Sequence, residues 1–376
     1  MTFDAGKRIR ELESQERLRV LRELQPLQSC RAIYQGQELH LFSTNDYLGM
    51  SRHPSVKDAL VNAAKQHGMG PRGAALICGY SESHQALECE LAALKDMDEA
   101  LLFPTGFQAN LGVLSALGGE STEFFSDALN HASIIDGIRL SRSPVSIYEH
   151  RNVDHLRRCL RESSATRKVV VTDALFSMDG TLAPLADIVQ VAREQGALVV
   201  VDEAHSTLLY GSKGGGWSEA CGVAHEIDFH VGTLSKAFGS QGGFVACSSE
   251  RRLWLLNVAR SFIFTTALPL PLVEAARAAL RTWSPSIVAE MRARIDKLES
   301  YLEESFQSPI VPFIVGDEGK AMNVSTELWE SGFHVPAVRP PTVPVGTSRL
   351  RIALSRAHEI EVVDELGQRL ASVRGS

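Results

Sequence analysis

The sequence predicts an α/β protein whose core is a large, mostly parallel β-sheet. Two continuous apolar runs, 168–173 and 197–202, lack the polar alternation of strands with one face in water, which indicates strands buried on both faces. Between them a helical pattern opens at Pro184 and is closed by Gly196, the positions these two residues favour. The runs end in Asp173 and Asp202, 29 residues apart, which is the length of one strand–helix–strand unit.

The alternation of predicted strands and helices continues on both sides of this unit. The spacing of Ile9, Leu12, Leu18 and Leu21 predicts an amphipathic helix within 1–22. Strands are predicted at 100–103, 123–126, 227–231 and 243–247, and a helix at 107–117. Beyond 283–285 we expect a helix at 287–306, strands near 309–315, 333–338 and 349–354, and a final helix. The predicted parts are an N-terminal helix and arm (1–49), a large α/β domain (50–282) and a small C-terminal α/β domain (283–376).

Composition restricts the function classes. The 376 residues include 38 Lys and Arg against 45 Asp and Glu, a net charge of −7, whereas proteins that bind nucleic acid or membranes favour a basic surface. No apolar stretch is long enough to span a bilayer. The six cysteines form no Cys-x-x-Cys pair and have no histidine at metal-ligand spacing. We therefore expect no disulfide framework, no metal site and a reducing, cytoplasmic location.

Candidate site residues follow the predicted strands. In an open α/β sheet, ligands bind beyond the carboxyl ends of the strands. The residues found there are Thr105, Gly106, His131, Asp173, Ser177, Asp202, His205, Thr233, Ser235 and Lys236. The glycine-rich dinucleotide fingerprint does not follow the first predicted strand, which argues against an NAD-dependent dehydrogenase. The sequence also contains no Gly-x-x-x-x-Gly-Lys-Ser/Thr phosphate loop.

Lys236 is the most informative of these residues. A lone loop lysine is usually solvated, but Lys236 lies in the segment 232–239, which follows a buried strand and consists mainly of small and apolar residues. Partial desolvation lowers the pKa of a lysine and makes its amine a nucleophile for carbonyl compounds. Pyridoxal phosphate chemistry needs such a lysine and a carboxylate that holds a proton on the pyridine nitrogen. Asp202, at the end of an apolar strand, supplies that carboxylate.

Further residues fit the same cofactor. Gly106 and Phe107 lie where a strand turns into a helix N-terminus, which favours a phosphate group, and Thr233 adds a hydroxyl group. His131 and His205 both follow strands. A lone histidine is more often a satisfied core residue, but an imidazole beside this cofactor can stack on the ring or donate a hydrogen bond to its oxygen.

These motifs together resemble the α-oxoamine synthases, a family of pyridoxal phosphate enzymes with the aspartate-aminotransferase-like fold (fold type I). The resemblance covers about residues 20–370 and is carried by the segments 43–49, 104–107, 130–133, 176–180, 202–205 and 232–239. The segments 339–344 and 349–351, with 68–73 and 78–80, are most similar to the biotin-pathway branch, which condenses L-alanine with a pimeloyl thioester.

The resemblance implies roles at the cofactor. Lys236 would hold the cofactor covalently and move the substrate's α-proton, and Asp202 would pair with the pyridine nitrogen. His131 would stack on the ring face, while His205 and Ser177 would contact the ring oxygen. The residues implied at the phosphate group are Gly106, Phe107, Thr233 and, from the second subunit of a homodimer, Thr265 and Thr266.

The resemblance also implies substrate contacts. Arg22 and Thr342 would touch the acyl substrate, and Asn45 would lie near the amino-acid carboxylate. Alternation in the strand 348–354 places Arg349 and Arg351 on the same face, so spacing alone leaves two candidates for the carboxylate and an internal salt bridge as a third reading. The resemblance selects Arg351.

Two departures keep alternatives open. The stretch 206–209 replaces a glycine-rich stretch of the family, and a serine at the position of Ser206 also occurs in the sphingolipid branch, so a synthase that uses glycine or serine remains an alternative. Asp173 stands where the family commonly has Glu. A non-catalytic subunit of a hetero-oligomer is disfavoured by the intact Lys236, Asp202 and His131. Coenzyme A and a carrier protein are both open as the acyl carrier.

Overall fold

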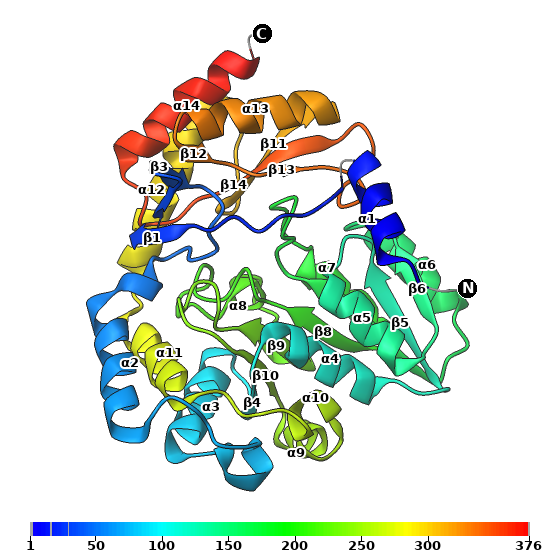
Figure 1. The fold of residues 1–376 in the computed structure, drawn as a ribbon. Coiled ribbons are helices and arrows are strands. Elements are labelled where there is room, and N and C mark those ends of the chain that lie inside the picture. The colour runs from blue at the N-terminus through cyan, green and yellow to red at the C-terminus, as the bar shows by residue number, and fades with distance from the viewer. Residues whose placement is uncertain (1–2, 16, 29, 375–376) are drawn as a thin grey trace.

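The computed structural model describes residues 3–15, 17–28 and 30–374, and a seven-stranded sheet forms its centre (Figure 1). In spatial order the strands are β4 (Glu99–Phe103), β10 (Gly243–Cys247), β9 (Phe229–Thr233), β8 (Leu198–Asp202), β7 (Arg167–Asp173), β5 (Thr122–Asp127) and β6 (Val145–Tyr148). The last five pair in parallel, whereas β10 is antiparallel to both of its neighbours. The predicted mixed, mostly parallel α/β sheet is therefore confirmed.

Helices cover both faces of this sheet, which explains the continuous apolar runs. Val169 and Val171 of β7 pack in the core under α4 (Gly106–Leu117) and α5 (Ala132–Ser141). Val170, between them, points to the opposite face and packs under α6 (Val153–Glu162) and α7 (Leu185–Glu194). Because successive strand residues face opposite sides, a strand covered on both sides needs apolar residues at every position.

Two smaller sheets lie above the large one in Figure 1. The three-stranded sheet contains β11 (Ile310–Gly316), β14 (Ser348–Ala353) and β13 (Ala337–Val338). The four-stranded sheet contains β1 (Gln25–Gln28), β2 (Arg31–Tyr34), β3 (Gln37–Leu41) and β12 (Phe333–His334). Since β3 pairs in parallel with β12, the N-terminal arm shares a sheet with the C-terminal region.

The remaining helices surround these sheets. They are α2 (Pro54–His67), α3 (Glu82–Leu94), α8 (Trp217–Ala220), α9 (Ser249–Val258), α10 (Arg260–Ile263), α11 (Leu270–Thr282), α12 (Pro285–Leu302), α13 (Glu318–Glu330) and α14 (Ile360–Arg374). The predicted helix 287–306 and the final helix correspond to α12 and α14. The division into three parts at 49/50 and 282/283 stays a prediction.

Two predicted elements are wrong in extent. The strand 333–338 is two short strands in different sheets, because Pro336, which has no N–H group to donate, separates β12 from β13. The N-terminal helix α1 spans only Ala5–Ser14, so Leu18 and Leu21 lie outside it. None of the side chains of α1 is buried, and a short helix without packing has little to extend it.

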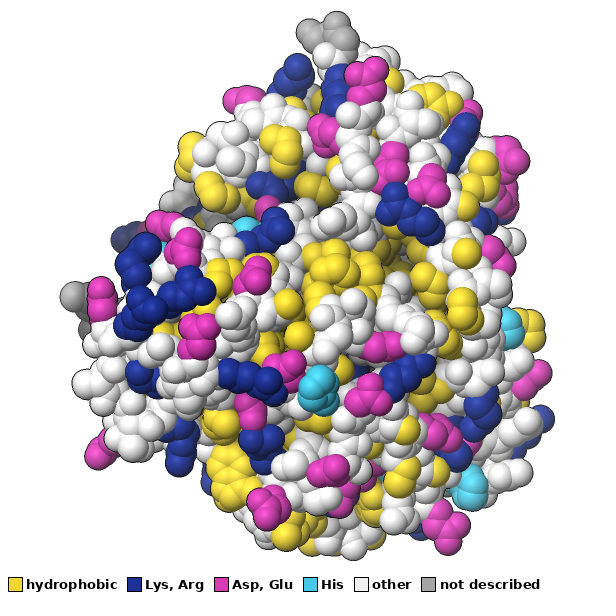
Figure 2. All heavy atoms as spheres, turned by 180° about the vertical axis from the view of Figure 1, so that it is seen from behind, with side chains coloured by type: hydrophobic (Ala, Val, Ile, Leu, Met, Phe, Trp, Pro, Cys, Tyr) yellow, Lys and Arg dark blue, Asp and Glu magenta, His cyan; other side chains and the backbone are white. Residues whose placement is uncertain are grey.

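The surface of the protein mixes charges of both signs. The face in Figure 2 shows cationic and anionic side chains interspersed around exposed apolar ones. Among the described helices, none combines the length and apolar character needed to cross a lipid bilayer. All six cysteines are free thiols. The cytoplasmic location stays a prediction.

Candidate active site

The candidate residues gather at the carboxyl edge of the large sheet. β8 ends at Asp202 and β7 at Asp173, and these two residues are direct neighbours in the parallel register. β9 ends at Thr233, and Lys236 lies in the connection from β9 to β10. β4 runs into the N-terminus of α4 at the same edge, where Gly106 abuts Thr233.

The amine of Lys236 lies in a partly desolvated position. The residue is half-buried, and burial lowers its pKa to about 8, although the carboxylates of Asp202 and Asp173 act in the opposite direction. The charge of Arg351 lowers it further. Asp173 is buried, and burial next to Asp202 raises its pKa well above the usual range. A substantial fraction of Lys236 is therefore neutral near pH 8, as a nucleophilic amine requires.

A hydrogen-bonded chain connects Asp202 with His131. Asp202 is buried, and its Oδ2 accepts a hydrogen bond of 2.6 Å from Nδ2 of Asn110 on α4. The same amide nitrogen donates to Ser133 Oγ (2.8 Å), which lies 2.8 Å from His131 Nδ1. The Ser133 N–H also donates to this Nδ1, so a neutral His131 carries its proton on Nε2. His131 is the N-cap of α5, and its backbone N–H donates to Asp173 (2.8 Å).

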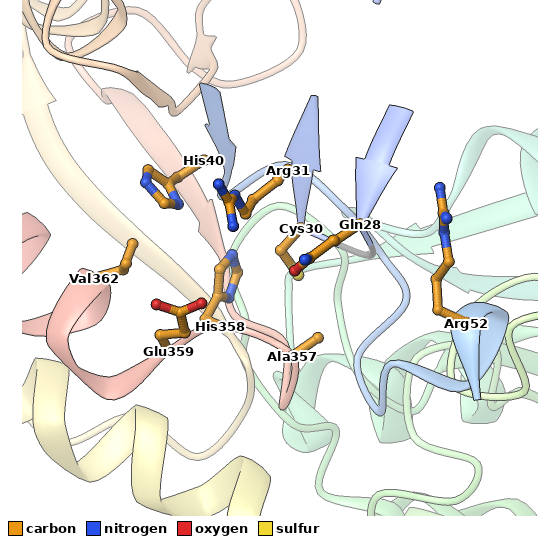
Figure 3. Close-up of a pocket in the computed structure, with 9 residues that line it drawn as sticks. All are labelled: Gln28, Cys30, Arg31, His40, Arg52, Ala357, His358, Glu359 and Val362. Carbon is orange, nitrogen blue, oxygen red and sulfur yellow. The ribbon is translucent and has the colours of Figure 1, made fainter. Parts of the chain in front are cut away.

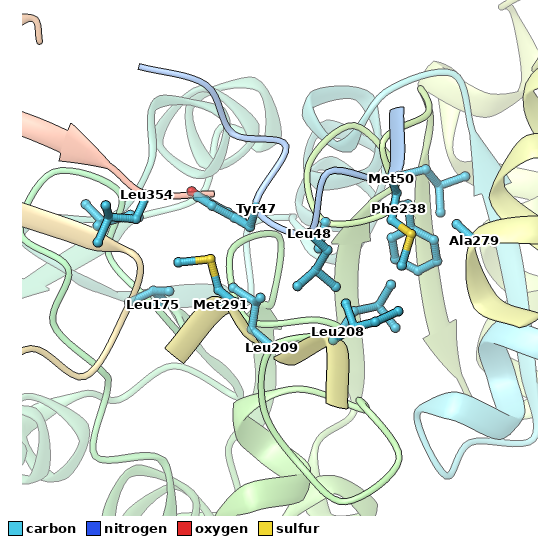
Figure 4. Close-up of a cluster of buried hydrophobic side chains, with 14 of the residues drawn as sticks. Tyr47, Leu48, Met50, Leu175, Leu208, Leu209, Phe238, Ala279, Met291 and Leu354 are labelled. Carbon is cyan, nitrogen blue, oxygen red and sulfur yellow. The ribbon is translucent and has the colours of Figure 1, made fainter. Parts of the chain in front are cut away.

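His205 is held by Tyr47, a residue to which the sequence analysis assigned no role. The Tyr47 hydroxyl lies 2.7 Å from His205 Nδ1 and donates to Asn45 Oδ1 at 3.3 Å. The ring of Tyr47 is fully buried among side chains that include Met291 and Leu354 (Figure 4). Burial, together with Lys236 and Arg351, holds the pKa of His205 well below its usual range, so this imidazole is neutral.

The N-terminus of α4 has free N–H groups that can bind an anion. Thr105 caps the helix by accepting the Gln108 N–H, and within the described chain the N–H groups of Gly106 and Phe107 have no acceptor. A Cβ on Gly106 would lie 3.1 Å from Thr233 Cβ, a tight contact that would press on this side chain. The hydroxyl of Thr233 donates to the Gly242 carbonyl at 2.8 Å. The free N–H groups of the helix suit a phosphate group, whereas the Thr233 proton is already used.

The structure distinguishes Arg351 from Arg349. Both are buried on β14, but Arg349 Nη1 pairs with Asp179. Arg351 has no carboxylate partner among the described residues, and its Nε donates to the Ser177 carbonyl (2.6 Å) and its Nη2 to Asn45 Oδ1 (3.3 Å). The internal salt bridge therefore belongs to Arg349, and Arg351 is a buried cation with N–H groups left for an anion.

The other predicted site residues contact different parts of the chain. Arg22 stacks on Trp329, with its guanidinium carbon 4.4 Å from the ring centroid. Thr342 lines a cavity of about 320 Å³ between the N-terminal segment and the loop after β13. Thr265 accepts a hydrogen bond from Gln108 of α4 in the same chain (3.2 Å), and Thr266 is exposed. Their predicted reach into a second subunit stays a prediction.

A buried ion pair holds the segment that follows Asp202. Lys95 Nζ donates to Glu203 Oε2 (2.8 Å) and to Thr207 Oγ1 (2.9 Å), and both charged side chains are fully buried. Burial opposes the charge of Glu203, but Lys95 and His230 outweigh it and hold the pKa of Glu203 well below its usual range. Ser206 Oγ donates to Glu203 Oε1 (3.2 Å). The hydroxyl groups of Ser206 and Thr207, which replace a glycine-rich stretch of the family, thus form hydrogen bonds with this ion pair.

Sequence reasoning missed Asn110, although a signal for it existed. It lies one helical turn after Gly106, so it shares the face of α4 that meets the strand ends.

A second cavity of about 210 Å³, lined by residues that include Cys30, His40 and His358, is shown in Figure 3. None of the residues that line this second cavity belongs to the candidate site.

The residues at the sheet edge fit pyridoxal phosphate. A half-buried lysine with a lowered pKa, a buried carboxylate beside it, a partly free imidazole ring and an anion-binding helix N-terminus form the donor set that this cofactor needs.

Comparison with known proteins gives the family. The family model for aminotransferase class I and II matches residues 37–370. An 8-amino-7-oxononanoate synthase of Arabidopsis thaliana is 44% identical over 359 residues, covering 89% of this chain and 75% of that protein. A protein of the same name from Anaeromyxobacter dehalogenans is 43% identical, covering 98% and 94%. A solved serine palmitoyltransferase with pyridoxal phosphate has a TM-score of 0.92 at 30% identity, covering 98% of this chain and 96% of that one. The chain therefore belongs to the aminotransferase class I and II family and, within it, to the α-oxoamine synthases, which are pyridoxal phosphate-dependent acyltransferases.

Proposed function

We propose that this enzyme is an 8-amino-7-oxononanoate synthase that condenses L-alanine with a pimeloyl thioester and releases CO2 and the thiol. The name of the curated relatives supports the product, and their identity extends over almost the whole chain. The structural observation that carries the proposal is Arg351, a buried cation without a carboxylate partner in the described chain, close enough to Lys236 to lower its pKa. A small amino acid has a carboxylate that Arg351 can bind and an amine that can react at the cofactor.

Each residue at the sheet edge has a defined task in this reaction. Bound pyridoxal phosphate supplies an electron sink for the pair left when a bond to Cα breaks. Asp202 holds a proton at the pyridine nitrogen, and Asn110 fixes the carboxylate for that purpose. Arg351 binds the amino-acid carboxylate and so determines which bond of Cα faces Lys236. The neutral Nζ of Lys236 takes the α-proton and returns a proton to the product.

The cavity beside Thr342 has a lining that supports the proposed pimeloyl thioester as the acyl substrate. It is lined by Arg17 and Arg19 from the N-terminal segment and by Met178, which follows Ser177 in the loop that contacts Arg351. The lining thus combines cations with a residue of the loop that contacts Arg351. This arrangement suits a long chain with an anionic end, as pimeloyl thioesters have.

We further propose a homodimer with shared sites. The neighbouring segments 73–79 and 264–267 expose Ile77 (81%) and Phe264 (70%) close to the N-terminus of α4. Exposed large apolar side chains that lie together mark an interaction surface. Light scattering of the purified holoenzyme should give twice the mass of the chain, and a fully active monomer would contradict the shared sites.

The substrate assignment has a direct test. Purified holoenzyme is incubated with L-alanine, glycine or L-serine and with pimeloyl, acetyl or palmitoyl thioesters, and the products are identified by mass. We expect product from L-alanine with the pimeloyl thioester, and α-proton exchange faster for L-alanine than for glycine or L-serine. Preferred use of serine with a long-chain thioester would overturn the proposal. The Ser206 hydroxyl, which bonds to Glu203, gives that alternative no structural support.

A further inference from the structure

The loop 176–181 carries the carbonyl group that orients Arg351. Arg351 Nε donates to the Ser177 carbonyl at 2.6 Å, and the neighbouring Asp179 pairs with Arg349. The loop is closed on itself by the Phe176 N–H, which donates to the Thr181 carbonyl at 3.0 Å. The direction of the Arg351 guanidinium therefore depends on where this loop is held.

One side of the loop is fixed by β11. Ser308 Oγ donates to the Gly180 carbonyl at 3.0 Å. A Cβ on Gly180 would lie 2.1 Å from the Ile310 carbonyl oxygen, so the loop approaches this strand as closely as backbone permits.

The other side of the loop is fixed by His150, which follows β6. Its Nδ1 lies 2.9 Å from Asp127 Oδ1 and its Nε2 lies 3.1 Å from Thr181 Oγ1. A carboxylate only accepts, so Nδ1 donates to Asp127, while Nε2 and the Thr181 hydroxyl share the second hydrogen bond. The imidazole also meets the Phe176 ring edge-on, with centroids 4.4 Å apart. His150 thus contacts both ends of the loop.

Asp127, which binds His150, is itself held by backbone hydrogen bonds. It ends β5 and is 2% exposed, and its two carboxylate oxygens accept the N–H groups of Leu129 and Arg151, each at 2.9 Å. The resulting chain leads from the sheet through Asp127 and His150 to the loop, and through the Ser177 carbonyl to Arg351.

We infer that His150 is a positioning residue for the substrate carboxylate, because it holds the loop 176–181 whose Ser177 carbonyl aims Arg351. The inference rests on the proposed use of an amino-acid substrate. His150 touches neither Lys236 nor Arg351 in the described structure, so its removal should weaken carboxylate binding and leave the chemistry at Cα nearly intact.

The test compares four holoenzyme variants. Thr181→Val removes the hydroxyl group that is hydrogen-bonded to His150, and Thr181→Ser retains it. His150→Asn keeps a donor for Asp127 but cannot reach Thr181. His155→Asn is the matched control, since His155 is similarly exposed on the neighbouring α6 and its contacts, Glu149 and Asn152, lie outside the loop.

Thr181→Val and His150→Asn should each raise KM for L-alanine about five- to tenfold, the effect of losing roughly one hydrogen bond, with kcat within about twofold of the parent enzyme. Thr181→Ser and His155→Asn should match the parent. The dissociation constant of L-alanine, measured from the change in visible absorbance of the holoenzyme, should follow KM. Unchanged KM, or a fall in kcat alone, would overturn the inference. A parent enzyme that does not respond to L-alanine would instead refute the proposed function, and the amino acid it does accept would replace L-alanine in the same comparison.

Discussion

Replacing Arg351 by glutamine is expected to raise KM for L-alanine far more than any other single change on β14. A guanidinium has five N–H donors. In the structure Nε is used by the Ser177 carbonyl at 2.6 Å and one N–H of Nη2 by Asn45 at 3.3 Å. A third contact, with the Tyr47 hydroxyl, uses another N–H group. Two donors remain, which suffice for a bidentate contact with a carboxylate.

The magnitude follows from burial. Arg351 is 8% exposed, so the carboxylate it binds is largely removed from water. Losing a buried contact between charged groups costs about 2–5 kcal/mol, which corresponds to a rise in KM of roughly 30-fold to several thousand-fold at 1.4 kcal/mol per decade. Cofactor content, measured from the absorbance of the purified protein, should stay the same.

Arg349→Gln is the matched control, because Arg349 lies on the same face of the same strand. Its partner is Asp179, so the loss should appear mainly as a lower midpoint of denaturant-induced unfolding, with KM raised at most a few-fold. Initial rates over a range of L-alanine concentrations separate the two cases. If both variants raise KM equally, or if Arg351→Gln raises it less than threefold, the assignment of the carboxylate to Arg351 is wrong.

Three further predictions concern the sheet edge and its support. In the cofactor-free protein, acylation of the Lys236 amine should increase with pH around a midpoint of about 8, because burial lowers the pKa of this ammonium group. Peptide mass mapping at a series of pH values measures the extent of acylation. A midpoint near 10.5, the ordinary value for lysine, would contradict the prediction. Asp202→Asn should still bind pyridoxal phosphate but lose about 3 kcal/mol or more of barrier lowering in α-proton exchange, and near-normal exchange would make Asp202 a structural residue. Lys95→Met should lower the free energy of unfolding by about 3–5 kcal/mol because it leaves the Glu203 carboxylate buried without its cation. Adding Glu203→Gln should recover part of that loss, and strictly additive losses would show that the two residues are not coupled.

Much of the fold could be read from local patterns. The apolar runs that predict β7 and β8 depend only on burial of both strand faces, and the sequence shows this directly. The boundaries of β12 and β13 could not be read in the same way, because Pro336 separates two strands that belong to different sheets, and pairing partners such as β3 lie about 290 residues away in the chain.

In the candidate site, too, some features follow from local sequence and others depend on distant segments. Local patterns were enough to predict that Lys236 follows a buried strand, that Asp202 ends another, and that Gly106 begins a helix, since each of these depends on a few neighbouring residues. The choice between Arg349 and Arg351 needed contacts between distant segments of the folded chain. Their spacing places both on one strand face, and the difference lies in Asp179, 170 residues away, which neutralises Arg349 and leaves Arg351 without a carboxylate among the described residues. Local periodicity determines which face a side chain occupies, whereas its charge partner comes from a distant segment that only the folded chain brings alongside.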